Sequence, residues 1–185
     1  MDKNLHRANL LAKRDKLSKK AVQSKSQKIF QNFLKLPGVF DKDNFLLYLP
    51  VRGEVDTSQI IEFLQSKNKR ILLPVFDKKS GEYKISVYEV YADLESGPYA
   101  ILQPVNIRTA DIDQVEIALI PGVAFDTRGD RLGYGKGVYD RLLGGFKGLK
   151  IGLAYDFQIV DKLPVEEHDM KMDLVVTEKG IYRIK

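Results

Sequence analysis

Five short apolar runs, separated by amphipathic segments, constrain the fold of this chain more than any other feature. The runs are NFLLYLP (44–50), RILLPVF (70–76), VEIALIPG (115–122), LKIGLAY (149–155) and DLVVTE (173–178). Near-continuous apolar strands of this length are typical of a mainly parallel sheet whose two faces are both buried. Ligands of such sheets bind beyond the carboxyl ends of the strands. The loops that follow these runs are therefore the first place to look for a functional site.

The segments between the runs predict the helices. Residues 3–16 and 19–35 have apolar positions at helical spacing, and Ser18 is expected to cap the second helix. Asp56 or Thr57 is expected to cap a third helix, and a fourth is expected over about 136–146. YKISVYEV (83–90) alternates like a half-exposed strand, IYRI (181–184) predicts a last edge strand, and 92–114 is expected to be irregular. We predict one α/β domain over 1–185, with helices on both faces of the sheet in a three-layer, Rossmann-like arrangement.

The positive charge of the chain is concentrated at its start. The net charge is +5, but residues 1–36 carry ten Lys or Arg and only two Asp. The two N-terminal helices are therefore expected to be basic. A basic arm is typical of proteins with an anionic partner, such as phosphate, a polycarboxylate or nucleic acid, although a solvated helix face has the same composition.

Composition excludes several classes of site. The absence of Cys excludes disulfides, thiolate zinc sites and cysteine nucleophiles, and two His are too few for a His-rich metal centre. A carboxylate site for a hard cation such as Mg²⁺ stays open. No apolar run is long enough to span a membrane and the start of the chain lacks an apolar signal segment, so a cytoplasmic location is expected.

The most informative local pattern is LIPGVAFDTRGDRLGYGKGVYDRL (119–142), in which glycine occupies every second position from 133 to 137. It is not a P-loop, because Asp130 stands where the first glycine is required and Gly137 replaces the Ser or Thr after Lys136. It is not a dinucleotide fingerprint either, because the spacing is G-x-G-x-G and a long loop precedes it.

The physics of phosphate binding still applies to this stretch. Glycines let backbone N–H groups converge on an anion, and the start of the next helix favours negative charge. Arg131 and Lys136 would supply positive charge, and Asp140 would hold a metal ion that bridges the same phosphates. The alternative is a tight turn, with Lys136 and Asp140 as an ordinary i,i+4 ion pair on a helix. Spacing alone does not decide between the two.

The stretch resembles the signature region of the 5-formyltetrahydrofolate cyclo-ligase (5,10-methenyltetrahydrofolate synthetase) family, which typically reads PGlaFD..G.RLGyGkGyYDr.L. Three further blocks resemble the same family: LHR followed by LAKRDKLS near the start, YLPVRGEVDT, and IGLAYDFQIVDKLPVEEHDMKMDLVVTE. The resemblance extends over nearly the whole chain and is weakest over 77–110.

The resemblance implies an ATP- and Mg²⁺-dependent enzyme that converts 5-formyltetrahydrofolate to 5,10-methenyltetrahydrofolate and releases ADP and phosphate. Phosphorylation of the formyl oxygen would turn it into a leaving group, and N10 would then close the ring. The expected ligands are ATP and a folate that is often polyglutamylated, whose glutamate tail would suit the basic arm. No nucleic-acid or membrane partner is expected, and a monomer is favoured.

The resemblance also implies roles for individual residues. Arg131 and Lys136 would be the catalytic phosphate cations, and Asp140 and Asp173 the Mg²⁺-associated carboxylates. The expected ATP contacts are Lys3, Arg7, Arg131, Leu132, Gly133, Tyr134, Gly135, Lys136, Gly137, Val138 and Tyr139. The expected substrate contacts are Leu49, Glu54, Tyr134, Gly135, Lys136, Gly137, Val138, Tyr155 and Gln158.

Two positions depart from the family pattern. Val138 stands where many members have the first Tyr of a YYD triplet, and Gln103 stands where Glu is common. The adjacent His168 and Asp169 are interpreted as loop structure rather than as a catalytic dyad. Two other classes of function stay open: an isomerase or transferase that acts on a phosphosugar or a coenzyme A ester, and an RNA-binding module that uses the basic arm.

Overall fold

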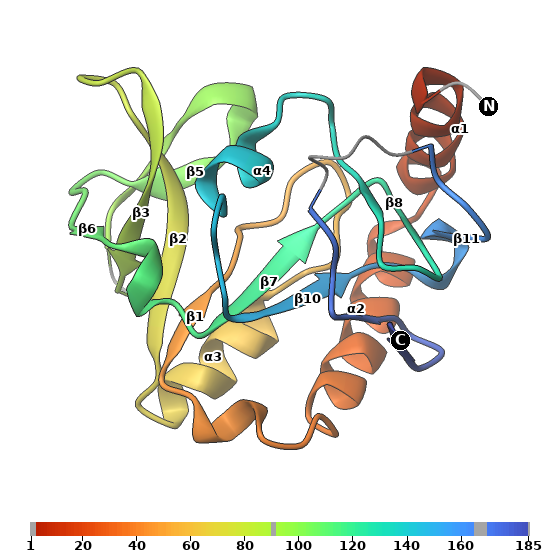
Figure 1. The fold of residues 1–185 in the computed structure, drawn as a ribbon, viewed down its shortest axis with the longest axis horizontal. Coiled ribbons are helices and arrows are strands. Elements are labelled where there is room, and N and C mark those ends of the chain that lie inside the picture. The colour runs from red at the N-terminus through yellow and green to blue at the C-terminus, as the bar shows by residue number, and fades with distance from the viewer. Residues whose placement is uncertain (1–2, 90–91, 165–169, 185) are drawn as a thin grey trace.

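The computed structural model describes residues 3–89, 92–164 and 170–184, and its centre is a mixed eight-stranded sheet (Figure 1). The strands run in the order β13-β12-β10-β7-β1-β2-β3-β6. Their bounds are β1 (Asn44–Leu46), β2 (Arg70–Asp77), β3 (Glu82–Tyr88), β6 (Thr109–Ala110), β7 (Ile117–Pro121), β10 (Leu149–Leu153), β12 (Leu174–Val176) and β13 (Ile181–Arg183). The strands β12, β10, β7, β1 and β2 pair in parallel, and the outer strands pair antiparallel. The predicted mainly parallel α/β fold is confirmed.

Alternate residues of the central strands enter two separate cores. Phe45 and Leu47 pack on one face of the sheet, whereas Leu46 between them packs on the other. All five residues of β7 are buried. This two-sided burial is the physical reason for the continuous apolar runs in the sequence.

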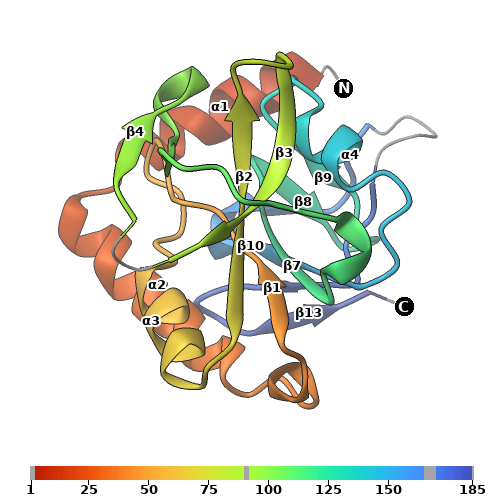
Figure 2. The same ribbon diagram turned by 90° about the vertical axis from the view of Figure 1, so that its left-hand side faces the viewer.

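The described part of the chain has four α-helices around the sheet: α1 (Lys3–Asp15), α2 (Lys19–Phe33), α3 (Ser58–Ser66) and α4 (Val138–Leu142). α2 and α3 lie side by side on one face (Figure 1 and Figure 2), where Ile29, Phe33 and Leu64 are buried in the core. The other face is covered by α4 together with a small sheet of β8 (Ala124–Asp126), β9 (Arg131–Leu132) and β11 (Ile159–Val160). α1 packs Leu10 against this small sheet.

The local predictions differ in outcome. Ser18 caps α2 as predicted, and its side chain accepts a hydrogen bond from the N–H of Ala21 over 3.2 Å. The helix predicted over 136–146 is confined to α4, because Gly137 (φ +60°) precedes it and Gly145 (φ +80°) follows it. The segment predicted to be irregular contains a hairpin of β4 (Leu94–Ser96) and β5 (Leu102–Pro104).

At the start of α3 the N-cap position is Thr57, whose side chain makes no capping hydrogen bond, whereas the Asp56 carboxylate before it accepts hydrogen bonds from the backbone and side chain of Ser58. The Thr57 hydroxyl instead donates to the carbonyl of Tyr48 over 2.7 Å and so fixes the loop after β1 to α3. Within the described ranges, no helix is long and apolar enough to cross a membrane.

Candidate active site

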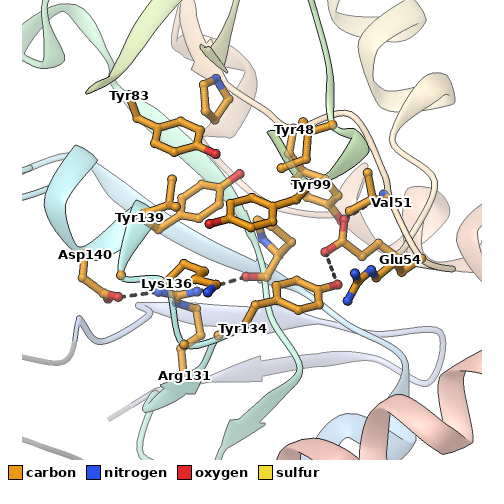
Figure 3. Close-up of a pocket in the computed structure, with 18 of the residues that line it drawn as sticks. Tyr48, Val51, Glu54, Tyr83, Tyr99, Arg131, Tyr134, Lys136, Tyr139 and Asp140 are labelled. Carbon is orange, nitrogen blue, oxygen red and sulfur yellow. Dashed lines mark hydrogen bonds and ion pairs between the residues drawn. The ribbon is translucent and has the colours of Figure 1, made fainter. Parts of the chain in front are cut away.

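A cavity of about 880 Å³ opens at the edge of the sheet where the parallel strands end (Figure 3). Its walls come from α1, the loop after β1, the hairpin of β2 and β3, the segment before β5, and residues 131–141. The predicted site residues that line it are Lys3, Arg7, Leu49, Glu54, Arg131, Leu132, Gly133, Tyr134, Gly135, Lys136, Gly137, Val138, Tyr139 and Asp140. The fold thus brings together residues from the first and the last third of the chain.

Residues 131–137, which we call the glycine loop, have glycine where arginine side chains come close. Gly135 and Gly137 have φ of +83° and +60°, a region that favours glycine. The loop is also fixed from α1, because Arg7 Nε donates to the carbonyl of Gly133 over 2.9 Å. A Cβ at positions 133, 135 and 137 would lie 2.8, 3.4 and 3.1 Å from guanidinium nitrogens of Arg131, Arg7 and Arg141, respectively.

Arg131 pairs with Asp140 across the base of the glycine loop. Nη2 of Arg131 lies 2.9 Å from Oδ1 of Asp140, and its Nη1 donates to the carbonyl of Pro121 over 3.4 Å. Lys136 lies before the first residue of α4, and Asp140 pairs with Arg131. The alternative, an i,i+4 ion pair of Lys136 with Asp140 on a helix, does not form. The Nζ of Lys136 lies over the ring of Tyr99, 5.6 Å from the ring centroid.

Glu54 is a buried carboxylate at the opposite wall of the cavity (Figure 3). Its Oε2 accepts a hydrogen bond from the N–H of Val51 over 3.0 Å, and its Oε1 accepts one from the Tyr134 hydroxyl over 2.8 Å. Burial raises the pKa of Glu54 above its usual value, although both hydrogen bonds act to lower it. Oxygen lone pairs remain on this carboxylate for a ligand N–H.

Aromatic and apolar side chains supply the rest of the cavity wall. Burial raises the pKa values of Tyr48, Tyr134 and Tyr139, so these phenols stay protonated at neutral pH. The Tyr83 hydroxyl is buried and has no hydrogen-bond partner within the described residues. Tyr83, Tyr99 and Arg141 also line the cavity and were not predicted from the sequence, because only the folded chain shows which side of β3, of the 92–114 segment and of α4 faces the cavity.

Two predicted substrate contacts, Tyr155 and Gln158, lie behind the cavity wall rather than in it. The Tyr155 hydroxyl donates to the backbone carbonyl of Glu54 over 3.0 Å. Gln158 Nε2 donates to the carbonyls of Gly122 and Val123 over 2.9 and 3.0 Å. Both side chains thus donate hydrogen bonds to the backbone of loops that border the cavity, so they stabilise these loops from behind.

Asp173, predicted to share a metal ion with Asp140, lies at the other edge of the sheet. It directly precedes β12, so it is at the amino end of the parallel strands, whereas the cavity is at their carboxyl ends. Its Oδ2 accepts from the N–H of Lys150 over 2.7 Å and lies 3.4 Å from the Lys150 ammonium. The fold therefore does not bring Asp140 and Asp173 together.

The described residues contain no group of three or more His, Cys, Asp or Glu that could hold a metal ion by itself. Mg²⁺ that accompanies a nucleotide needs only one or two carboxylates, because phosphates and water supply the other oxygens. Asp140, at the cavity wall beside the glycine loop, suits that requirement. His168 and Asp169 lie outside the described residues.

Gln103, one of the two departures from the family pattern, fastens the β4–β5 hairpin to β2. Its amide oxygen accepts from the N–H of Phe76 over 2.8 Å, and its Nε2 donates to Phe76 O and Glu95 Oε1 over 3.1 and 3.2 Å. Glutamate at this position would lose both donated bonds and would face the Glu95 carboxylate. The other departure, Val138, lines the cavity.

The profile of the 5-formyltetrahydrofolate cyclo-ligase family matches residues 1–178. The chain belongs to this family. The 5-formyltetrahydrofolate cyclo-ligase of Escherichia coli K12 is 32% identical over 176 residues, which cover 92% of this chain and 97% of that protein. The cyclo-ligase of Haemophilus influenzae is 32% identical over 157 residues, which cover 81% and 84%.

Solved structures of the cyclo-ligase family agree with this assignment. The Aquifex aeolicus 5,10-methenyltetrahydrofolate synthetase superimposes with a TM-score of 0.88 at 37% identity, over 100% of this chain and 94% of that one. The Mycoplasma pneumoniae 5,10-methenyltetrahydrofolate synthetase gives 0.78 at 31% identity, over 96% and 99%. The chain is therefore an enzyme with the cyclo-ligase fold over its whole length, as the resemblance predicted.

Proposed function

We propose that this enzyme converts 5-formyltetrahydrofolate, with or without a polyglutamate tail, to 5,10-methenyltetrahydrofolate, using ATP and Mg²⁺ and releasing ADP and phosphate. The observation that carries this proposal is the mixed lining of one cavity. Cations line it around the glycine loop: Lys3, Arg7, Arg131, Lys136 and Arg141. Aromatic and apolar side chains line it as well, among them Tyr48, Leu49, Leu73, Pro74, Tyr99, Ile101 and Leu102. The cations suit a triphosphate, and the aromatic and apolar side chains suit a folate ring system.

The reaction needs both ligands in one place. The N5-formyl group is an amide, so resonance makes its carbon a weak electrophile. Its oxygen is a poor leaving group because it would have to leave as oxide or hydroxide. Transfer of the γ-phosphoryl group to that oxygen forms an O–P bond and breaks the bond to ADP. N10 then bonds to the formyl carbon, the carbon–oxygen bond breaks, phosphate leaves, and the N10 proton is released. The protein contributes chiefly by aligning the two ligands and by neutralising the phosphoryl charge.

The cations around the glycine loop suit this task in different ways. Arg131 has a side chain only 6% exposed and is held by Asp140, so it offers a fixed positive charge at the cavity wall. Lys136 carries its ammonium on a flexible stem over Tyr99, which suits a group that follows the transferred phosphoryl. Arg7 and the backbone of residues 132–139 would complete the ATP site, with Lys3 nearby on α1.

The remaining predicted residues suit the folate and the metal. Glu54 would accept hydrogen bonds from N–H groups of the folate, and Leu49 and Val138 would contact its rings. Tyr155 and Gln158 would act from behind, by fixing the loops that carry Glu54 and Gly122. Asp140 would hold Mg²⁺ together with phosphate oxygens and water, and bound Mg²⁺ would neutralise phosphate charge.

Absorbance of the methenyl product tests the proposal directly. Purified enzyme is mixed with 5-formyltetrahydrofolate, with and without ATP and Mg²⁺, and we expect product only when both are present. Lys136→Ala is expected to abolish turnover without loss of the folded state, measured by circular dichroism. If the complete mixture forms no more product than a control without enzyme, the proposed function is wrong.

A further inference from the structure

Arg14 is a buried arginine on α1 that joins three loops around the cavity. Its side chain is among the largest that are fully buried, with 2% of the residue exposed. Nε donates to the carbonyl of Arg52 over 3.0 Å and Nη1 to the carbonyl of Gly122 over 3.4 Å. Nη2 donates to the Tyr134 hydroxyl, and the guanidinium carbon lies 5.4 Å from the centroid of the Tyr134 ring, a cation–π contact. One side chain thus links the loops after β1 and β7 to the glycine loop.

Arg14 is connected to the Glu54 carboxylate by two hydrogen bonds that share the Tyr134 hydroxyl. Within the described part of the chain, none of the ion pairs involves Arg14. The Tyr134 hydroxyl accepts from Arg14 and donates to Glu54 Oε1 over 2.8 Å. A buried guanidinium is costly without a nearby anion, and a buried carboxylate is costly without a nearby cation. Each therefore stabilises the other across the phenol.

We propose that Arg14 is a positioning residue for the cyclisation: acting through Tyr134, it keeps Glu54 ionised and fixed between the two ligand loops. This inference rests on the proposed function. When N10 bonds to the formyl carbon and phosphate leaves, positive charge spreads over N5, the bridging carbon and N10. An ionised Glu54 stabilises that charge, whereas a protonated Glu54 does not. Arg14 itself lies outside the lining of the cavity, so its effect is indirect.

The surroundings of Glu54 give the direction of the pH effect. Five ionisable side chains interact electrostatically with the Glu54 carboxyl group: Arg14 on α1, Arg52 on its own loop, Tyr48 after β1, Tyr134 on the glycine loop and Tyr139 on α4. Burial raises the pKa of Glu54, and the Arg14 charge acts in the opposite direction. Without Arg14, the carboxyl group would therefore take up its proton at higher pH.

The experiment compares Arg14→Met and Tyr134→Phe with wild type. It measures kcat and KM for 5-formyltetrahydrofolate from pH 5.5 to 9, and the equilibrium binding of 5-formyltetrahydrofolate without ATP over the same range. We expect both substitutions to move the acid limb of kcat/KM upward by roughly one pH unit, the lower end of the shift that a lost opposite charge produces. On the acid limb we expect kcat/KM to fall by up to about tenfold, because a shift of one pH unit lowers the ionised fraction of Glu54 by at most that factor. The double variant should lose less than the sum of the two single losses, because both changes break the same connection.

Arg128→Met is the matched control, because Arg128 binds Asp126 and Asp130 away from the cavity. It should lower stability and leave the pH profile unchanged. If Arg14→Met and Tyr134→Phe both keep the wild-type acid limb, Arg14 has only a structural role and the inference is wrong. If Arg14→Met does not fold, Tyr134→Phe decides. Failure of the wild type to form product would instead reject the proposed function.

Discussion

Arg131 and Asp140 are each other's partners: Nη2 of the arginine lies 2.9 Å from Oδ1 of the aspartate. The sequence resemblance assigned these two residues to different ligands, the first to phosphate and the second to Mg²⁺. In the structure they form one ion pair between the start of the glycine loop and α4, with side chains 6% and 27% exposed. We therefore expect the nucleotide site to be held in shape by this pair before any ligand binds.

Asp140→Asn removes the negative charge of this side chain and keeps its size and shape. The amide oxygen still accepts a hydrogen bond from Arg131, but the buried guanidinium loses its anion, so the free energy of unfolding should fall by about 2–3 kcal/mol. The negative charge for Mg²⁺ is lost, so kcat should fall at least about tenfold and more Mg²⁺ should be needed for half-maximal rate. Urea unfolding and initial rates over a Mg²⁺ titration measure both effects. An unchanged Mg²⁺ requirement would contradict the role of Asp140.

Asp173→Asn, in contrast, is expected to leave activity unchanged. Asp173 lies at the amino edge of the sheet, where its carboxylate accepts from the N–H of Lys150. Its side chain is 45% exposed, so the ion pair with Lys150 contributes less than about 1 kcal/mol to stability. We expect kcat and the Mg²⁺ requirement to stay at wild-type values when measured in parallel with Asp140→Asn. A higher Mg²⁺ requirement in this variant would instead mean that Asp173 contributes to the metal site during turnover.

The contrast between these two aspartates illustrates what the sequence predicts about the site. Asp140 lies three residues after the end of the glycine loop, in the first turn of α4, so its place beside the loop could be predicted from spacing. For Asp173 the resemblance and the strand pattern point to different edges: Asp173 is the first residue of the apolar run 173–178, and the parallel pairing of β12 with β10 puts the start of that run at the amino edge. Strand direction places a residue that precedes a strand away from the ligand edge.

The fold itself was more predictable than the site. The apolar runs predicted β2, β7 and β10 because burial on both faces requires apolar side chains at successive positions in the middle of each strand. The length of α4 and the role of Arg14 were not predictable. Arg14 contacts Gly122 and Tyr134, which lie 108 and 120 residues further along the chain. From the sequence alone, Arg14 is one more cation of a basic helix.

Asp126 is expected to make stability depend on pH in the acid range. Its side chain is buried and accepts hydrogen bonds from the N–H groups of Leu163, Arg128 and Asp130 over 2.9, 2.9 and 3.0 Å. Burial acts to raise the pKa of Asp126, but these hydrogen bonds and the Arg128 guanidinium lower it below its usual value. Its contribution is therefore fully present above the unfolded pKa of about 3.9 and is lost as the pH falls through the lower folded pKa.

Asp126→Asn measures this contribution. The amide keeps an acceptor for part of the backbone but carries no charge, so the variant should be less stable than wild type at pH 7. The difference in free energy of unfolding should shrink as the pH falls below about 4. Urea unfolding at a series of pH values between 2.5 and 7 gives both curves. Curves that run parallel over this range would show that Asp126 does not carry the acid sensitivity.

A methyl group added to the glycine loop should weaken ATP binding, whereas a methyl group added to an ordinary turn should affect stability alone. Gly135 and Gly81 both have positive φ, +83° and +72°, so alanine at either position should cost about 1 kcal/mol of stability. At Gly81, in the turn between β2 and β3, an added Cβ meets nothing within 4 Å. At Gly135 it lies 3.4 Å from Nη2 of Arg7, on the wall of the cavity.

Gly135→Ala should therefore raise the KM for ATP by about tenfold, a loss of about 1.4 kcal/mol in binding, whereas Gly81→Ala should leave it unchanged. Thermal unfolding of both variants controls for the shared cost of the backbone conformation, and initial rates over an ATP titration separate them. The interpretation of residues 131–137 as a phosphate-binding loop requires this difference. Equal KM values in the two variants would leave these glycines with a role in the turn alone.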